Sequence, residues 1–534
     1  MSKIETALVS VSDKTGLPDF VQGLRDFGVQ IISTGGTADL LRDHDIKVRD
    51  VADYTGFPEI LDGRVKTLHP KVHGGVLARR GQQPDEQQLD EFGIETIDMV
   101  VVNLYPFEET IARPDVDLME AVESIDIGGS TLIRAAAKNY THVAVVTSPE
   151  RYGEIIDEME QTGGHLRERT HYELALEAFQ HSSHYDAAIA RYLGRIGQEP
   201  GTHRDLITVE LKKKQELRYG ENPHQSAAFY VESGRKEPSV SSANQIAGPE
   251  LSFNNILDID AGMELVKEFD LPMAVCVKHT SLSGAGSAES IHEAYRAAYL
   301  GDPKRGLGGV VVLNRPFDVP TAELVARFRA TEDGEKLEHF VAAIAAPEIH
   351  QDAVKTLYNG VNWACKVRLL ETGSLCATCI DESEMDMRKV VGGMLVQDRN
   401  LLGFNEAAVT VPTDCEPTDG QMRDLAFAWL CCKHQKSNST VLAADRAMVG
   451  AAVGHMSRAE STQVAIQNAA GRARGAVMAT DGFIVSEEPV EWAAEAGITA
   501  IIQPGGGEHQ ESVVSAANRH GIPMVLGGVR HFRH

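Results

Sequence analysis

The chain has 534 residues, which is enough for three or four domains at about 150 residues each. Its 51 Lys and Arg residues against 77 Asp and Glu residues give a net charge of −26, which argues against binding to nucleic acid or to an anionic membrane surface. A content of 43% hydrophobic and 24% charged residues excludes a mainly disordered chain.

No apolar run approaches the roughly 18 residues that a membrane helix needs. The first residues, MSKIETALVSVSDK, contain neither a long apolar segment nor a small-residue cleavage site, so we expect a cytoplasmic protein. The seven cysteines all lie after residue 275 and are too few for a disulfide framework, so we expect reduced thiols.

The first 150 residues repeat one pattern, in which a short β-branched apolar run is followed by a Gly, Ser or Thr turn and then by helical spacing. This pattern predicts an open parallel sheet with crossover helices. Ligands bind such sheets beyond the carboxyl ends of the strands, so the turns are expected to line one crevice. The runs are Ala7–Val11, Val29–Ile32, Met99–Leu104 and Val143–Val146.

Residues 151–204 have helical spacing and are interpreted as a helical connector, with a boundary near residue 200. In residues 205–534 three short patterns recur in the same order, at offsets of 155, 171 and 159 residues. They pair Lys278-His279 with Lys433-His434, the triplet at 288–290 with that at 459–461, and the triplet at 350–352 with that at 509–511. The echoes predict two related α/β units, at approximately 205–365 and 366–534, with the two Lys-His pairs at related clefts.

The turn Ser33-Thr34-Gly35-Gly36-Thr37 follows a predicted strand and opens a helix. Free N–H groups and the helix dipole at such a site favour an anion by about 0.3–1 kcal/mol, and glycines let a phosphate approach the backbone. The alternative is a tight turn with a Thr cap. Ser10, Ser12 and Lys14 at the end of the neighbouring strand favour the phosphate site.

The segment Arg64–His73 places three cations and two imidazoles in ten residues of an acidic chain. It is either a solvated basic loop or part of the anion site, and its proximity to the predicted crevice favours the second. His69 and His73 lack an H-E-x-x-H pattern and are not interpreted as metal ligands.

A second glycine turn, Ile125–Thr131, leads into a helix that ends near Lys138. Its spacing leaves Asp126 as a helix cap and Lys138 as an exposed helix end. Later in the chain, Lys278 and His279 follow a β-rich run. This pair is either incidental or combines a proton carrier near neutral pH with a cation that stabilises an oxyanion.

The pattern Cys376-Ala377-Thr378-Cys379 suggests a zinc or redox site. No second cysteine pair stands at zinc-finger spacing, and no Pro-Cys-x-x-Cys follows His509-Gln510-Glu511. We therefore interpret the two cysteines as small buried residues and expect no metal.

Nine motifs occur in one order along nearly the whole chain: SVSDKTGL, STGGTA, TGFPE, DGRVKTLHPKVHGG, NLYPF, IDIGGSTLIRAAAKN, LRYGENPHQ, KHTS and RHFRH. In these the chain closely resembles the family of bifunctional purine-biosynthesis enzymes that combine phosphoribosylaminoimidazolecarboxamide formyltransferase with IMP cyclohydrolase. The resemblance implies formyl transfer from 10-formyltetrahydrofolate to aminoimidazolecarboxamide ribonucleotide (AICAR), followed by dehydrative ring closure to IMP.

The resemblance also implies a fold and an assembly. A methylglyoxal-synthase-like cyclohydrolase domain is expected at 1–150. A transferase region of duplicated cytidine-deaminase-like units without zinc is expected at 205–534. The family works as a homodimer, with transferase sites at the interface.

The roles carried over from the family cover both reactions. In formyl transfer, His279 takes the amine proton and Lys278 stabilises the transition state. In ring closure, Lys138 is the general-base candidate, and Lys66, Tyr105 and Asp126 shape the reacting formamide. The substrate-binding set is Ser12, Lys14, Thr34, Gly35, Gly36, Thr37, Arg64, Thr67, Asn103 and Gly128 for the cyclohydrolase, and Arg218, Tyr219, Asn438, Phe483 and Arg530 for AICAR, with Arg458 and Glu488 expected at the folate.

Three positions depart from the family pattern. The residues after His279 lack the usual proline, Asp481–Val485 replaces an aromatic-rich run, and Glu488 stands where the family has a folate-contacting aspartate. Two other functions stay open at this point. One is a regulatory protein that binds a phosphorylated effector through the N-terminal sheet. The other is a single-activity enzyme with another one-carbon donor, such as ATP-activated formate, although the chain contains no P-loop motif.

Overall fold

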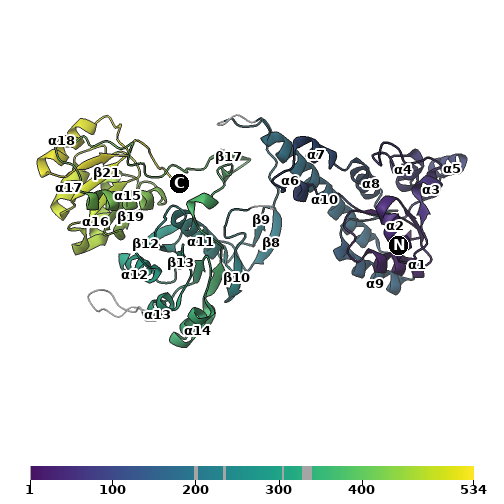
Figure 1. The fold of residues 1–534 in the computed structure, drawn as a ribbon, viewed down its shortest axis with the longest axis horizontal. Coiled ribbons are helices and arrows are strands. Elements are labelled where there is room, and N and C mark those ends of the chain that lie inside the picture. Colours follow the sequence, from purple (N-terminus) through teal and green to yellow (C-terminus); the bar gives the residue numbers. More distant parts are fainter. Residues whose placement is uncertain (1, 198–201, 233–235, 303–305, 328–339) are drawn as a thin grey trace. The chain divides into compact units, whose positions relative to one another are not determined.

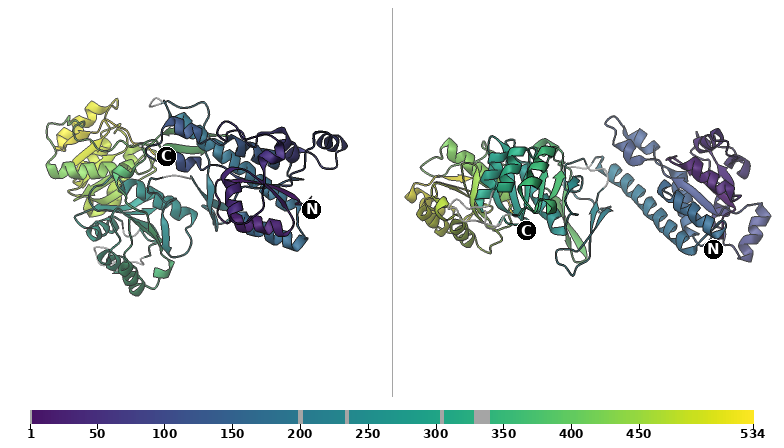
Figure 2. Two further views of the ribbon diagram at one scale, coloured as in Figure 1. Left: turned by 45° about the vertical axis from the view of Figure 1, so that its right-hand side comes forward. Right: turned by 90° about the horizontal axis from the view of Figure 1, so that it is seen from below.

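The computed structural model describes residues 2–197, 202–232, 236–302, 306–327 and 340–534. The chain forms two compact units, Met1–Glu210 and Leu211–His534 (Figures 1 and 2). In the described part of the chain, no helix combines the length and apolar character that a membrane crossing needs.

The first unit is built on a five-stranded parallel sheet with the order β4-β3-β2-β5-β6. Successive residues of a strand point to opposite faces, so Leu8 lies in one core cluster and its neighbour Val9 in another. The predicted open parallel sheet is confirmed. Its strands are β2 (Thr6–Val11), β3 (Gln30–Ser33), β4 (Arg49–Asp50), β5 (Met99–Asn103) and β6 (Ala144–Val146), and β1 (Ser2–Lys3) pairs separately with β7 (His165–Leu166).

Helices cover both faces of this sheet. Ile155 and Met159 of α9 pack in the cluster that contains Val9, and Ala175 and Ala178 of α10 pack in the other. The two long helices of the segment interpreted as a connector, which lie within residues 152–195, therefore contribute to the core of the first unit. The helices are α1 (Leu17–Asp26), α2 (Gly35–Asp43), α3 (Val51–Thr55), α4 (Pro70–Leu77), α5 (Gln83–Phe92), α6 (Phe107–Ile111), α7 (Leu118–Glu123), α8 (Ile127–Lys138), α9 (Tyr152–Thr162) and α10 (Glu168–Arg195).

The second unit contains an eleven-stranded sheet with the order β10-β15-β14-β13-β11-β12-β19-β18-β20-β21-β22. Antiparallel pairing of Gly286 in β12 with Ala447 in β19 joins its two halves. The strands are β10 (Asn244–Ala247), β11 (Met273–Lys278), β12 (Ser281–Ser287), β13 (Val310–Leu313), β14 (Ala343–Ala346), β15 (Arg368–Glu371), β18 (Thr440–Ala444), β19 (Ala447–Ala452), β20 (Val477–Thr480), β21 (Ala500–Gln503) and β22 (Met524–Leu526).

Each half contributes the same succession of elements: a helix, a hairpin, and three further strands that alternate with helices. The helices are α11 (Phe253–Val266), α12 (Ile291–Gly301), α13 (Val319–Arg327) and α14 (Gln351–Gly360) in the first half, and α15 (Asp419–Lys433), α16 (Arg458–Ala469), α17 (Glu488–Ala496) and α18 (Gln510–His520) in the second. Two separate hairpins, β8 (Lys212–Leu217) with β9 (Ala227–Val231) and β16 (Met385–Val390) with β17 (Gly393–Asp398), complete the unit.

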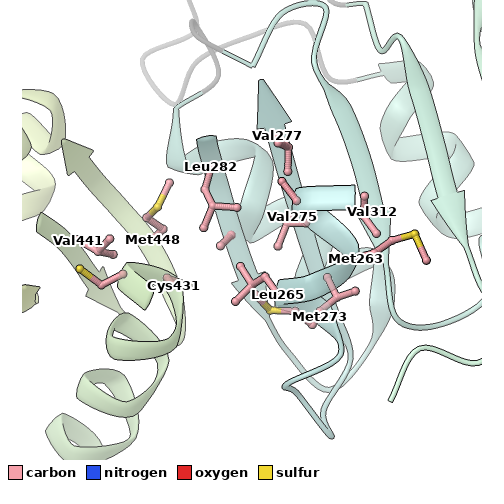
Figure 3. Packing of buried hydrophobic residues seen from close by; sticks show 14 of the residues in the cluster. Met263, Leu265, Met273, Val275, Val277, Leu282, Val312, Cys431, Val441 and Met448 are labelled. Atoms are coloured by element: carbon pink, nitrogen blue, oxygen red, sulfur yellow. The ribbon is translucent and has the colours of Figure 1, made fainter. Parts of the chain in front are cut away.

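One core spans the junction of the two halves. Val275 and Leu282 of the first half belong to the same buried cluster as Cys431, Val441 and Met448 of the second (Figure 3). The hydrophobic effect therefore holds the halves together as one body.

The structure corrects the first two sequence echoes. Lys278-His279 lies at the end of β11, whereas Lys433-His434 ends α15, so the two pairs occupy different elements. Ser290 and Ser457 are the residues that precede α12 and α16, so the second echo was aligned four residues too late. The third echo is correct, because His350 and His509 directly precede α14 and α18.

A different set of residues relates the halves at a constant offset of 166. Ser252 and Thr418 each form a capping box at the start of the helix before the hairpin. The hairpin turns also correspond, because positions 279 and 280 and positions 445 and 446 all have positive φ angles. The boundary expected near residue 366 lies just before β15, which pairs with β14 and so belongs to the first half. The cytidine-deaminase-like character of the halves stays a prediction.

Candidate active sites

The first candidate site lies where β3 ends and α2 begins. Thr34 precedes the helix, and its side chain does not cap the backbone N–H groups of the first turn. Gly35 has φ of 55°, a conformation that glycine adopts without strain. Exposed N–H groups and the helix dipole at this point attract an anion.

Two ammonium groups converge on this turn. The Nζ of Lys66 lies 3.5 Å from the position that a Cβ on Gly35 would take, and the Nζ of Lys14 lies 3.3 Å from the equivalent position on Gly36. Lys14 also donates a hydrogen bond to the Gly36 carbonyl at 3.0 Å. The turn, Lys14 and Lys66 together make a site with the charge and the donors that a phosphate requires.

Other predicted substrate contacts hold the crevice in shape. The hydroxyl of Thr37 accepts from the Val11 N–H and donates to its carbonyl, at 3.2 and 3.1 Å. The Oδ1 of Asn103 accepts from the N–H groups of Ser12 and Asp13, at 2.7 and 2.8 Å. These bonds fix the loop after β2, so Thr37 and Asn103 position the site.

The start of α8 brings Asp126, Thr67 and Gly128 to the same region. Asp126 caps the helix by accepting from the Gly129 N–H at 2.7 Å, and it also accepts from the N–H of Tyr105. Burial raises the pKa of Asp126, although these bonds and the charge of Lys66 oppose the rise. The buried hydroxyl of Thr67 lies 3.0 Å from the position that a Cβ on Gly128 would take.

Two of the predicted cyclohydrolase residues, Lys138 and Arg64, make none of the contacts described above. Lys138 is exposed at the last position of α8, and at about 1.5 Å per residue roughly 16 Å of helix separates it from the start, beside Asp126. One chain therefore does not bring the general-base candidate to the others. Arg64 is exposed and forms an ion pair with Glu123.

Sequence reasoning missed Tyr185. Its hydroxyl accepts from the Asp126 N–H at 2.8 Å and donates to the Ser124 carbonyl at 3.3 Å. Tyr185 belongs to α10, so the segment interpreted as a connector supports the cap of α8. The apolar spacing of α10 gave no signal for this contact, which joins residues 59 positions apart.

The second candidate site lies at the β11–β12 turn. His279 and Thr280 have φ angles of 54° and 60°, which are strained for residues with a side chain, most of all for β-branched Thr. The buried carboxylate of Asp258 on α11 accepts from the Thr280 N–H at 2.6 Å and from the His279 N–H. Lys278 donates through Nζ to the Leu307 carbonyl at 2.7 Å, and the His279 side chain is exposed.

Asp258 is the second residue that the sequence did not reveal. Burial raises its pKa, and the two N–H groups together with the charges of His279 and Lys278 oppose the rise. In the other half, Asp424 accepts from the N–H groups of Asp445 and Arg446 at 3.0 and 2.7 Å. Both hairpin turns are therefore held by a carboxylate of the preceding helix.

Four of the predicted transferase residues gather near the carboxyl end of β20. Asn438 accepts from Arg458 at 2.8 Å, and Arg458 also pairs with buried Asp481. Position 482 is crowded, because a Cβ there would lie 2.5 Å from Arg458 Nη2 and 2.7 Å from the Phe532 ring, over which Arg530 stacks at 4.3 Å. Phe483, which directly follows, is partly exposed.

The geometry disfavours Arg458 as a direct folate ligand. Arg458 is only 5% exposed, and its guanidinium group donates hydrogen bonds to Asp481, Asn438 and the Ser439 carbonyl. Glu488, the other predicted folate residue, is exposed at the start of α17.

Arg218 and Tyr219 belong to a segment that lies beside the start of α11, because the Asn254 side chain donates to the Glu221 carbonyl at 3.5 Å. The guanidinium group of Arg218 lies 5.3 Å from the centre of the Tyr219 ring. Burial is the largest cause that lowers the pKa of Arg368, and the positive charge of Arg218 lowers it further.

The cysteines are free thiols, as expected. Cys376 and Cys379 are partly exposed, so the interpretation of this pair as buried residues is wrong. Among the described residues, no group of three or more His, Cys, Asp or Glu side chains is placed to hold a metal ion.

Comparisons with known proteins give one answer over the whole chain. The family model described as AICARFT/IMPCHase bienzyme matches residues 136–468, and that described as MGS-like domain matches residues 16–131. Three proteins named bifunctional purine biosynthesis protein PurH are similar. The protein from Ruminiclostridium cellulolyticum is 46% identical (99% of this chain and 100% of its own), that from Magnetococcus marinus 45% (100% of both), and that from Bacillus cereus 45% (99% of both).

Among solved structures, one titled "Crystal structure of ForH" matches 36% of this chain and 100% of its own, with 37% identity and a TM-score of 0.34. The full-length relatives and the two family models together establish the family. The chain belongs to the AICARFT/IMPCHase bienzymes, the bifunctional enzymes of purine biosynthesis.

Proposed function

We propose that the two activities are divided between the two units, with ring closure in the first and formyl transfer in the second. The enzyme transfers a formyl group from a folate co-substrate to AICAR and closes the ring of formyl-AICAR to give IMP. That the folate is 10-formyltetrahydrofolate belongs to the proposal.

The convergence of Lys14 and Lys66 on the uncapped start of α2 carries the assignment of the first unit. A nucleotide whose phosphate binds there directs its base toward Asp126 at the start of α8 and toward Tyr105, which follows β5. Ring closure is unimolecular, because the carboxamide nitrogen attacks the formyl carbon of the same molecule and water leaves. Holding these two atoms in contact supplies much of the rate.

In the second unit, the amine of AICAR attacks the formyl carbon of the folate. The bond from that carbon to the folate nitrogen breaks, and the nitrogen leaves with a proton. His279 takes the amine proton, and Lys278 stabilises the negative oxygen of the tetrahedral intermediate. Neither reaction requires a metal ion in this scheme.

We further propose that the enzyme works as a homodimer in the cytoplasm. Lys138 is separated along α8 from the groups that it is expected to assist. A second copy that supplies Lys138 removes the separation. Mixing a Lys138→Ala variant with a Lys66→Met variant then restores part of the cyclohydrolase activity, whereas two monomeric sites give no recovery.

The test of the function uses purified protein with AICAR and 10-formyltetrahydrofolate, and a parallel reaction started from formyl-AICAR. IMP in both reactions is expected. His279→Ala is expected to abolish only the first reaction and Lys66→Met to impair the second. IMP from formyl-AICAR alone contradicts the formyl transfer and favours another one-carbon donor. Binding of formyl-AICAR without turnover favours a regulatory protein.

A further inference from the structure

Cys376 and Cys379 form a pair of accessible thiols in the loop between β15 and β16. Both are partly exposed, whereas Cys276, Cys431 and Cys432 are buried. Burial raises the pKa of each of these three thiols, which makes them poor nucleophiles. The Cys-x-x-Cys pair differs from them both in access to solvent and in chemical environment.

The loop is fixed on both sides of the pair. Leu375 is 1% exposed and packs in the large core of the second unit. On the other side, the Asp381 N–H donates to Glu237 Oε2 at 2.9 Å, and Glu237 is paired with Lys267 and Arg399. Within the pair, the Cys379 N–H donates to the Cys376 carbonyl at 3.1 Å. This short anchored turn keeps the two side chains together, so closing a disulfide requires little further ordering of the chain.

The surroundings favour a thiolate at Cys376. Thr378 Oγ1 lies 3.3 Å from the Cys376 sulfur, and the Ser374 hydroxyl donates to the same sulfur at 3.7 Å. The Cys379 thiol also donates to Cys376, and this bond is the largest cause that lowers the pKa of Cys376, to about 7. The same bond raises the pKa of Cys379. Cys376 is thus the nucleophile of the pair, and Cys379 keeps its proton until after Cys376 has reacted.

The geometry does not favour a metal. Structural zinc needs four ligands, and among the described residues no third His, Cys, Asp or Glu side chain completes a group with these two. Dithiol chemistry needs only the two sulfurs.

We propose that Cys376 and Cys379 are a reversible dithiol–disulfide site that exchanges with small disulfides of the glutathione type. The Cys376 thiolate attacks one sulfur of oxidised glutathione and releases one glutathione thiolate, leaving a mixed disulfide on Cys376. Cys379 then loses its proton and attacks the Cys376 sulfur, which releases the second glutathione. The protein loses two electrons and two protons, and one oxidised glutathione becomes two reduced molecules.

The first measurement is the alkylation rate of each cysteine in the reduced full-length protein, read by peptide mass spectrometry. A pKa near 7 rather than 8.5 raises the thiolate fraction at pH 7 about 15-fold and lowers the intrinsic nucleophilicity about fivefold. We therefore expect Cys376 to react about threefold faster than exposed Cys365, the internal reference. An equal or slower rate overturns the proposal.

The second measurement follows oxidation by glutathione in matched variants. Wild type is expected to form the Cys376–Cys379 disulfide, which dithiothreitol reverses. Cys379→Ser is expected to accumulate a glutathione adduct on Cys376, because the resolving thiol is gone. Cys365→Ser is the control and should behave as wild type. A stable adduct on wild-type Cys376, or no adduct in Cys379→Ser, contradicts the assigned roles.

Discussion

The carboxylate of Asp258 is predicted to hold the β11–β12 turn in the conformation that we propose for formyl transfer, and Asp258→Ala tests this directly. The variant leaves two N–H groups of the turn without their acceptor. It also removes the contact that keeps His279 and Thr280 at positive φ, a conformation that costs roughly 1–2 kcal/mol per residue.

For the two residues together this cost is about 2–4 kcal/mol. The paired strands β11 and β12 still constrain the turn in the variant, so we take about half of this cost as the free energy needed to restore the active conformation. A barrier higher by about 1–2 kcal/mol lowers kcat roughly 5–30-fold. The assay is formyl transfer to AICAR, with cyclohydrolase activity in the other unit measured in parallel and expected to be unchanged. Asp258→Asn keeps an acceptor oxygen and is expected to recover most of the rate.

Asp424→Ala is the matched control. It removes the equivalent anchor from the β18–β19 turn, where Asp445 and Arg446 replace His279 and Thr280. We expect a similar loss of stability in thermal unfolding and little loss of formyl transfer. Equal losses of activity in the two variants would refute the reasoning, as would an Asp258→Ala enzyme with at least half of the wild-type rate.

Three further predictions concern other parts of the chain. Lys14→Met should raise the KM for formyl-AICAR about tenfold in steady-state kinetics with little change in kcat, because the phosphate that we propose it binds is present in substrate and transition state alike. The pKa of His184 rises to about 9, first because of its hydrogen bond to Glu108 and then that to Glu210. The stability that protonated His184 gives to the folded protein is therefore complete below its unfolded pKa of 6.5 and is lost as the pH rises through 9. Calorimetry should show that the free energy of unfolding falls by about 1 kcal/mol over this window, since His184 is partly exposed. The His184→Asn variant should show no such loss. Arg530→Ala should reduce formyl transfer at least tenfold without lowering the unfolding temperature, whereas unchanged transfer would remove Arg530 from the site.

The Arg530 variant is a sharper test than removal of the last five residues. His531 is 1% exposed, and its N–H donates to the Asp481 carbonyl at 3.0 Å. The Arg533 N–H donates to Ser437 at 3.1 Å. A truncation removes these structural bonds together with Arg530, so its loss of activity has two causes, whereas the point variant changes only an exposed side chain.

The sheet of the first unit could be predicted from the sequence because each strand is marked by residues that are adjacent in the chain. Buried parallel strands are nearly continuous apolar runs, and the glycine turns mark their carboxyl ends. The same local pattern marks the glycine turn at Gly35 and Gly36, which we propose as the phosphate site. Tyr185 could not be found in this way, since its bond to Asp126 depends on how α10 packs against α8.

The repeat in the second unit shows the opposite case. The Lys-His dipeptide at 278 recurs at 433 by coincidence, and in the fold Lys433 is buried and paired with Glu268 at 2.8 Å. The correspondence that the fold does contain pairs Ser252 with Thr418, whose side chains differ, and Asp258 with Asp424, whose side chains are the same. What both halves keep is a hydrogen-bonding role at a given place, and such a role can be filled by different residue types.

Comparison of the two hairpin turns separates what the fold requires from what the reaction requires. Both hairpin turns have two residues at positive φ and a carboxylate anchor, so the fold requires the anchor in each half. Asp445 and Arg446 show that the turn forms without His or Thr, and Asp tolerates this conformation better than β-branched Thr does. The strained pair His279-Thr280 is therefore not explained by folding. Its strain, its exposed imidazole and the adjacent Lys278 are explained if the turn presents these groups to a substrate, which is the role that the Asp258 and Asp424 variants distinguish.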